Sequence, residues 1–209
     1  MPKPFHRPVR RPSASFDNIV GAGDPADDLR VAHTTASALL ERARTDATGE
    51  TAQRLIDFTA EHGIDEIAEV WAKAPARSLP GALWRLYLLQ ASIQGDPALT
   101  ALLYERGRVE LRTADAVIAG APTPASPEEL GALIDTILHG VFRGDFAVAL
   151  DRAAAFCRVV AAGATHAADD DEGTEPQRAT ALTQRAYRLT TSAEDLTACA
   201  AAWRRGVLI

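Results

Sequence analysis

Apolar residues recur at helical spacing along most of the chain that follows residue 23. The first such stretch contains Leu29, Ala32, Ala36, Leu39, Leu40 and Ala43. Asp24 is suited to cap this stretch and Pro25 to occupy its first turn, so the pattern predicts a helix from there to about Arg44. Further helices are expected over residues 55–62 and 64–71. No alternating pattern typical of a strand extends over more than a few residues.

The segment ALWRLYLLQASI, residues 82–93, is the most hydrophobic part of the chain. Ser78 precedes it as an N-cap, and apolar residues almost all round predict that this helix is central in the fold. Asp96 and Pro97 begin the next helix, whose pattern reaches about Leu111 with a possible break near Gly107.

Helix starts are also marked in the second half of the chain. Ser126, Pro127 and Glu129 form a capping sequence for a helix that is expected to end at residues 139–140. Asp145 opens another helix, which Gly163 is expected to stop. After an acidic loop, two helices are predicted, from Gln177 to about Leu189 and from Ala193 to Arg205, with Ser192 capping the second.

Together these elements predict an all-α fold, a single irregular bundle of about eight to nine helices packed around the helix that contains Trp84. Residues 24–209 form the helical domain in this interpretation. Residues 1–23 are expected to be a flexible, basic, proline-rich arm without regular structure, because each proline fixes φ and removes a hydrogen-bond donor.

Composition agrees with a globular protein, because 47% of the 209 residues are hydrophobic and 24% are charged. The net charge of −6 disfavours direct binding to nucleic acid or to an anionic membrane, which requires a basic surface. No stretch reaches the roughly 18 consecutive apolar residues of a membrane span, so a cytoplasmic protein is expected. Cys157 and Cys199 lie far apart in helical patterns and are expected to be buried, reduced thiols.

The segment THAADDDEG, residues 165–173, holds the densest group of metal-ligand side chains. Known calcium loops alternate their ligands, and zinc sites on helices space them by three or four residues. Three contiguous aspartates follow neither pattern, so we expect a solvated loop between helices and no metal or other cofactor. His62 and His139 each precede a glycine and are expected to interact with the carbonyl groups at helix ends.

Motifs of catalysis are absent from the sequence. It contains no nucleophile elbow, no Walker loop and no metalloprotease motif, so no residue is assigned a catalytic role. Cys157 would act as a nucleophile only with a base that the fold brings near it. The sequence therefore favours a protein that is not an enzyme.

The arm is the first candidate for an interaction site. Its basic and aromatic side chains are suited to a protein partner: Lys3, Phe5, Arg7, Arg10 and Arg11. Nucleic acid is a less favourable ligand, because so few cations give weak binding that depends strongly on salt. A solvated tail is the alternative.

The second candidate is a ligand pocket at Trp84, Arg85 and Tyr87, where an arginine stands in an apolar helix. Such an arginine either binds an anion inside the bundle, lies on a thin exposed stripe of the helix, or pairs with an acidic side chain while its stem packs against a tryptophan. The structural pairing is the favoured interpretation, since an unpaired buried charge is costly.

Three segments resemble a family of small all-helical proteins from high-GC Gram-positive bacteria: HGIDEIAEVWAKAPARSLPGALWRLYLL, GDFAVALDRAAAFCRVVAAG and AWRRG. The resemblance extends from about Pro8 to the end of the chain. Members of that family often carry the description "DNA-directed RNA polymerase subunit beta", although these segments contain none of the active-centre motifs of a β subunit. The resemblance implies a possible link to transcription and supplies no catalytic residues.

Three functions remain open at this stage. The first is a cytoplasmic helical scaffold or adaptor that binds an unidentified protein partner, without a membrane. The second is a transcription-associated factor that contacts RNA polymerase or DNA. The third is a helical enzyme or small-molecule binder with a pocket near Arg85.

Overall fold

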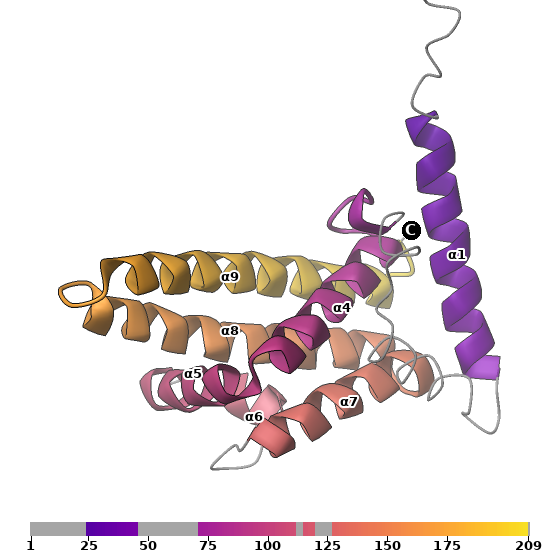
Figure 1. Cartoon of the computed structure of the whole chain (residues 1–209). Coiled ribbons are helices and arrows are strands. Elements are labelled where there is room, and N and C mark those ends of the chain that lie inside the picture. The colour runs from indigo at the N-terminus through magenta and orange to yellow at the C-terminus, as the bar shows by residue number, and fades with distance from the viewer. Residues whose placement is uncertain (1–23, 46–70, 112–114, 120–126, 209) are drawn as a thin grey trace, which may run out of the picture.

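A computed structural model of the chain describes residues 24–45, 71–111, 115–119 and 127–208. Every regular element in these residues is an α-helix, which confirms the predicted all-α class for this part of the chain (Figure 1). The predicted arm and the helices expected between residues 55 and 70 lie outside the described residues. None of the described helices is both long enough and apolar enough to cross a membrane.

The described residues form seven helices: α1 (Pro25–Thr45), α4 (Leu79–Gly95), α5 (Pro97–Glu110), α6 (Asp115–Ala119), α7 (Pro127–Arg143), α8 (Phe146–Asp171) and α9 (Pro176–Arg204). Predicted N-caps are confirmed where capping bonds form. Ser78 Oγ accepts from the backbone N–H of Gly81 at 3.2 Å, and the Asp96 carboxylate accepts from that of Leu99 at 2.9 Å. Asp145 caps α8 in the same way. At these three positions the polar side chain marks the start of the helix correctly.

The central helix is α8, so the prediction that the helix containing Trp84 is central was wrong. In Figure 1, α8 and α9 lie side by side as a long pair, and α8 packs against α5, α6, α7 and α9. Its buried face consists largely of alanine, which lets neighbouring helices approach closely. Helix α4 crosses the outside of this pair, and its Leu88 side chain remains 46% exposed.

Two glycines that were expected to interrupt helices instead allow two helices to touch. Helix α5 continues past Gly107, and α8 continues past Gly163. A Cβ atom on Gly107 would lie 1.8 Å from the carbonyl oxygen of Val159, and one on Gly163 would lie 1.8 Å from that of Leu103. The predictions of a break at Gly107 and a stop at Gly163 were therefore wrong, because backbone contact between α5 and α8 requires glycine at both positions.

The acidic segment is also helical for most of its length, so the predicted loop was wrong. Helix α8 runs through residues 165–171, and only Glu172–Glu175 form the connection to α9. Asp170 pairs with Arg106 of α5 at 2.8 Å, and Asp171 pairs with Arg178 of α9 at 3.0 Å. These ion pairs offset the repulsion between neighbouring carboxylates that favoured an extended chain.

Helix α9 is continuous, so the prediction of two helices separated near Ser192 was wrong. Asp195, three residues after the predicted cap Ser192, is buried and pairs with Arg77 and with Arg85 of α4. Helix α7 similarly passes residues 139–140 and ends at Arg143. Tertiary contacts in these places outweigh the local end signals.

A ladder of polar contacts sets the antiparallel register of α8 and α9. Asp151 pairs with Arg204, Arg158 donates to Thr197 at 3.3 Å, and Asp171 pairs with Arg178 at the connected ends. Residue numbers rise on one helix as they fall on the other. This register gives the described part of the bundle a stiff support on which the shorter helices pack.

Helix α1 lies across one end of this support and contacts α4 and α7 (Figure 1). It buries a narrow stripe of mostly small side chains: Ala32, Ala36, Leu40 and Ala43. Trp71 Nε1 donates to Thr35 Oγ1 at 3.1 Å, and the Arg44 guanidinium lies 5.2 Å from the ring centre of Trp203. The predicted end of this helix near Arg44 is confirmed.

Candidate functional site

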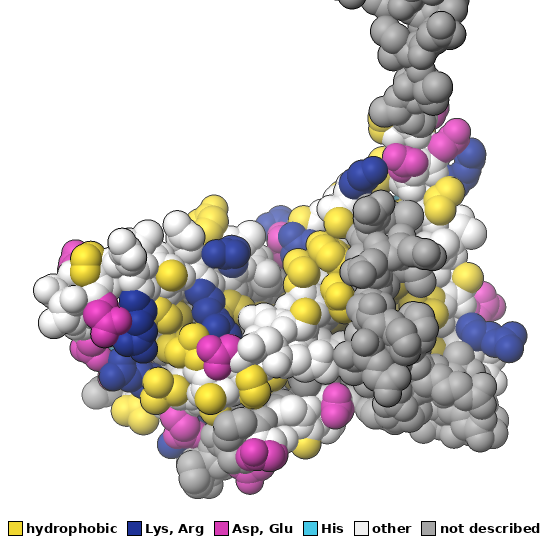
Figure 2. Space-filling view, in the orientation of Figure 1, with side chains coloured by type: hydrophobic (Ala, Val, Ile, Leu, Met, Phe, Trp, Pro, Cys, Tyr) yellow, Lys and Arg dark blue, Asp and Glu magenta, His cyan; other side chains and the backbone are white. Residues whose placement is uncertain are grey.

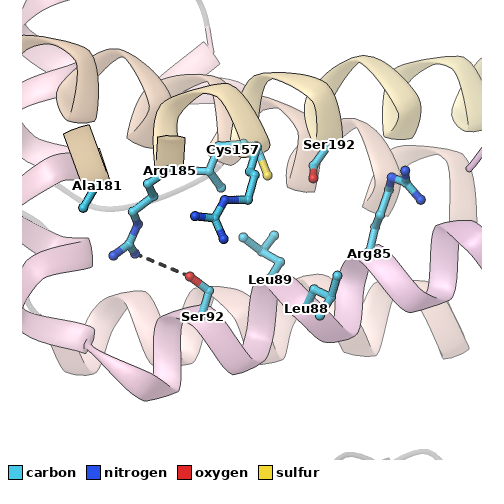
Figure 3. A pocket seen from close by; sticks show the side chains of 10 residues that line it. Arg85, Leu88, Leu89, Ser92, Cys157, Ala181, Arg185 and Ser192 are labelled. Atoms are coloured by element: carbon cyan, nitrogen blue, oxygen red, sulfur yellow. Dashed lines mark hydrogen bonds between the residues drawn. The ribbon is translucent and has the colours of Figure 1, made fainter. Parts of the chain in front are cut away.

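A cleft of about 420 Å³ lies between α4 and α9, with Cys157 of α8 contributing to its lining (Figure 3). Helix α4 lines it with Arg85, Leu88, Leu89 and Ser92, at positions i, i+3, i+4 and i+7. Helix α9 lines it with Ala181, Arg185, Arg188, Leu189 and Ser192. Both sets follow one face of their helix, so the cleft runs along the two helices rather than across them.

Two contacts define the ends of the cleft. At one end Arg85 of α4 pairs with Asp195 of α9, and at the other Arg185 of α9 reaches Ser92 of α4 at 3.5 Å. The helices are therefore antiparallel along the cleft. Residues 85 and 92 are two turns apart on α4, which corresponds to about 10 Å of helix.

The charge of Arg85 is compensated. Its Nη2 atom donates to Asp195 Oδ2 at 2.7 Å, and Asp195 also accepts from Nε of Arg77 at 3.0 Å. The Arg85 side chain is 17% exposed and that of Asp195 is 9% exposed, so the pair is largely removed from water. The structural pairing that was predicted for Arg85 is therefore present, and it joins α4 to α9.

Arg185, at the other end, has only hydroxyl partners among the described residues. It donates to Thr100 Oγ1 at 2.8 Å and to Ser92 Oγ, and it forms no ion pair with a described carboxylate. Burial lowers the pKa of the Arg185 guanidinium, and the charge of Asp96 offsets part of that effect. The side chain nevertheless remains cationic at neutral pH, because the guanidinium group of arginine is not deprotonated in proteins.

Unused donors accompany these charges. The Nε atoms of Arg85 and Arg185 are both buried and make no hydrogen bond within the described residues. A buried donor without a partner costs free energy unless water or a ligand accepts from it. Arg188 adds a third cation, whose Nε donates to the backbone oxygen of Gln184 at 3.3 Å.

The wall between the two ends is apolar. Leu88 and Leu89 lie between Arg85 and Arg185 in Figure 3, and Leu189 of α9 faces the same space. Figure 2 shows hydrophobic and Lys or Arg side chains next to each other on the face that carries α4 and α9. The cleft thus combines cationic ends with an apolar middle, as is common in sites for organic ligands.

Cys157 does not supply a nucleophile. Its side chain is buried, and burial raises the pKa of its thiol to about 12. Burial likewise raises the pKa of Cys199 to about 11. Because the thiolate is the reactive form, both groups are inert at neutral pH, and the predicted buried, reduced thiols are confirmed.

The structure places only one of the three residues that the sequence predicted for a pocket in the cleft. Arg85 lines the cleft, whereas Trp84 and Tyr87 do not; their rings stack on each other at 5.3 Å. Arg185 and Arg188 of α9 were not predicted. Their spacing of three residues, followed by Leu189, was the available signal, but only the fold shows that this face of α9 meets α4.

The other candidate residues lie away from the cleft or outside the described part. His166 Nε2 lies 3.5 Å from Glu110, and the described residues contain no group of three or more His, Cys, Asp and Glu side chains that could hold a metal. Lys3, Phe5, Arg7, Arg10 and Arg11 lie outside the described residues, as does His62. His139 lies within α7, four residues before its end.

Comparisons with protein-family models, curated proteins and solved structures give no match to this chain. The resemblance to small all-helical proteins from high-GC Gram-positive bacteria therefore stays a prediction.

Proposed function

We propose that this protein binds a small organic molecule in the cleft between α4 and α9. The observation that carries the proposal is the pair of buried Nε donors of Arg85 and Arg185, which have no partner in the described residues and border an apolar hollow. A ligand that accepts hydrogen bonds and has an apolar part would satisfy the donors and cover the leucines together.

The size of the cleft supports this function. Its volume of about 420 Å³ lies within the range of roughly 300–1,000 Å³ that is usual for small-molecule sites. It forms between helices of a bundle, which is a common position for such sites. The Arg85–Asp195 pair holds the two lining helices together, so the helices need little rearrangement, and only the arginine side chains must turn to bring their buried Nε donors to a ligand.

Binding without catalysis is the simplest reading of the lining residues. Their ionisable groups are three arginines and Cys157, whose thiol pKa is about 12. None of these exchanges a proton readily at neutral pH, as a general acid or base must. A carrier or ligand sensor therefore suits the cleft better than an enzyme.

The adaptor and transcription functions remain predictions from the sequence. The adaptor was expected to use the basic arm as one binding site, and that arm lies outside the described residues; the transcription-associated function follows from the family resemblance. Deletion of residues 1–12 followed by affinity purification would test the arm without affecting the cleft.

The cleft is tested by filling it. Ser192 projects from α9 into the cleft in Figure 3, so Ser192→Phe should occlude the site. Thr190→Phe is the matched control, because Thr190 is exposed on the same helix and does not line the cleft. The amphipathic fluorophore anilinonaphthalene sulfonate should bind the wild type and the control at one saturable site, and the Ser192→Phe variant at least about tenfold more weakly. Equal binding by all three proteins would refute the proposed site.

A further inference from the structure

From the uneven charge of the two ends of the cleft, we infer that the ligand is an amphipathic anion whose carboxylate or phosphate head binds Arg185 and whose apolar body lies along Leu88, Leu89 and Leu189. The inference rests on the proposed function and specifies its ligand class. It also predicts that the charged end of the ligand lies at Arg185 and that its apolar end points towards Arg85.

The head group belongs at Arg185 because no described carboxylate forms an ion pair with that cation, and the charge of Asp96 acts on it only from beyond ion-pair distance. Arg85 already donates to Asp195 at 2.7 Å, and an added anion there would be repelled by that carboxylate. Arg185 instead donates to the neutral hydroxyls of Thr100 and Ser92, and its Nε is free of partners among the described residues. A planar guanidinium with unused donors matches the oxygens of a carboxylate or phosphate group.

Arg188 strengthens the same end. It lies one turn beyond Arg185 on α9 and lines the same cleft, and it forms no ion pair with a described carboxylate. Two cations on one helix face, close to an apolar wall, raise the local attraction for an anion. Burial of the Arg185 end strengthens the attraction further, because water screens the charge less.

The apolar body follows from the length of the cleft. About 10 Å of α4 separates Ser92 from Arg85, and Leu88 and Leu89 fill the interval. Leu89 is already buried, but Leu88 is 46% exposed and Leu189 is partly buried, so a compact ion such as inorganic phosphate would leave apolar surface of the cleft uncovered. A chain or ring system of about that length would cover this surface and gain the free energy of burying it.

The chain's own arm is a poor occupant of this site. Lys3, Arg7, Arg10 and Arg11 have the same charge as the arginines of the cleft, so the arm would be repelled. An external anion is the complementary ligand.

Calorimetric titration of the full chain with octanoate, octyl phosphate, octanol and inorganic phosphate tests the inference. Octanoate or octyl phosphate should bind at least about tenfold more tightly than octanol, and inorganic phosphate alone should bind more weakly than octyl phosphate. The tighter of the two amphiphiles identifies the head group. Octanol binding as tightly as both anions would overturn the inference, even if the cleft binds ligands.

Substitution of Arg185, with a control arginine outside the cleft, separates this result from a general effect of charge. Arg185→Gln should weaken the binding of the anions by about 10- to 100-fold while leaving the affinity for octanol unchanged, which also shows that the cleft is intact. Arg178→Gln, on the same helix but outside the cleft, should leave both affinities unchanged. Unchanged anion binding by Arg185→Gln would overturn the inference, whereas failure of every amphiphile to bind the wild type would refute the proposed function itself.

Discussion

Gly107 and Gly163 are the residues at which the packing of the bundle depends most sharply on one side chain. They lie where α5 and α8 cross, and each accepts a backbone carbonyl of the other helix in the space of a Cβ atom. Glycine often ends helices, which is why the sequence pattern suggested a break near Gly107 and an end at Gly163. A glycine in a helical pattern can therefore either end the helix or let a neighbouring helix come into backbone contact. Only the position of the neighbouring helix distinguishes the two cases.

Gly163→Ala should destabilise the protein by about 3 kcal/mol, because the new Cβ would lie 1.8 Å from the carbonyl oxygen of Leu103 and the two helices would have to separate. Gly131→Ala is the matched control, since a Cβ at Gly131 of α7 meets no atom within 4 Å. That variant should gain up to about 1 kcal/mol from helix propensity. Urea unfolding measures both, and a stable Gly163→Ala protein would show that the helices do not cross in this way.

Because of Cys157, the free energy of unfolding should depend on pH in the alkaline range. The folded protein holds the thiol proton up to a pKa of about 12, whereas the unfolded chain releases it near 9.0. The contribution of the buried neutral thiol to the free energy of unfolding is therefore complete below about pH 9. It is lost as the pH rises towards about 12.

Cys157→Ala lacks this thiol, so the difference in free energy of unfolding between wild type and variant should shrink as the pH rises from 9 to 12. Denaturant unfolding at several pH values provides the measurement. A difference that stays constant over this interval would mean that the thiol is not buried.

At the scale of helices, Asp195 joins α9 to α4 through two arginines. Its carboxylate accepts from Arg85 and Arg77, and it shapes one end of the cleft. Asp195→Asn should cost about 3 kcal/mol, because it leaves the Arg85 cation largely buried without a counter-charge.

The double variant Arg85→Leu, Asp195→Leu should recover much of that loss, since it removes both charges together. Thermal unfolding of the single and double variants gives the coupling between the two residues. Additive losses would show that Arg85 and Asp195 act independently.

Local signals in the sequence predicted the starts of helices better than their ends. The caps at Ser78, Asp96 and Asp145 were correct because a cap depends on residues within one turn. The ends expected at Gly163 and before Ser192 were wrong because contacts between α8 and its neighbours carry both long helices past them. The cleft was only half predicted for a related reason: Arg85 stands out in its own helix, whereas Arg185 becomes notable only when α9 lies beside α4.

At the scale of the molecule, the long α8–α9 pair supports the other described helices, and α4 lies on its outer face (Figure 1). This arrangement explains why the most hydrophobic segment of the sequence is not the most buried helix. One side of α4 packs on the bundle through Leu83, Leu86 and Ile93, while Leu88 remains exposed beside the cleft. Hydrophobicity that is not used for packing is available for a ligand.

A crystal structure of the protein with an alkyl carboxylate that carries bromine on its terminal carbon tests ligand binding in the cleft most directly. It should show an anomalous bromine peak beside Leu88 and the carboxylate within hydrogen-bond distance of the Arg185 guanidinium. An empty cleft at saturating ligand, or a ligand with its carboxylate at Arg85, would contradict this prediction.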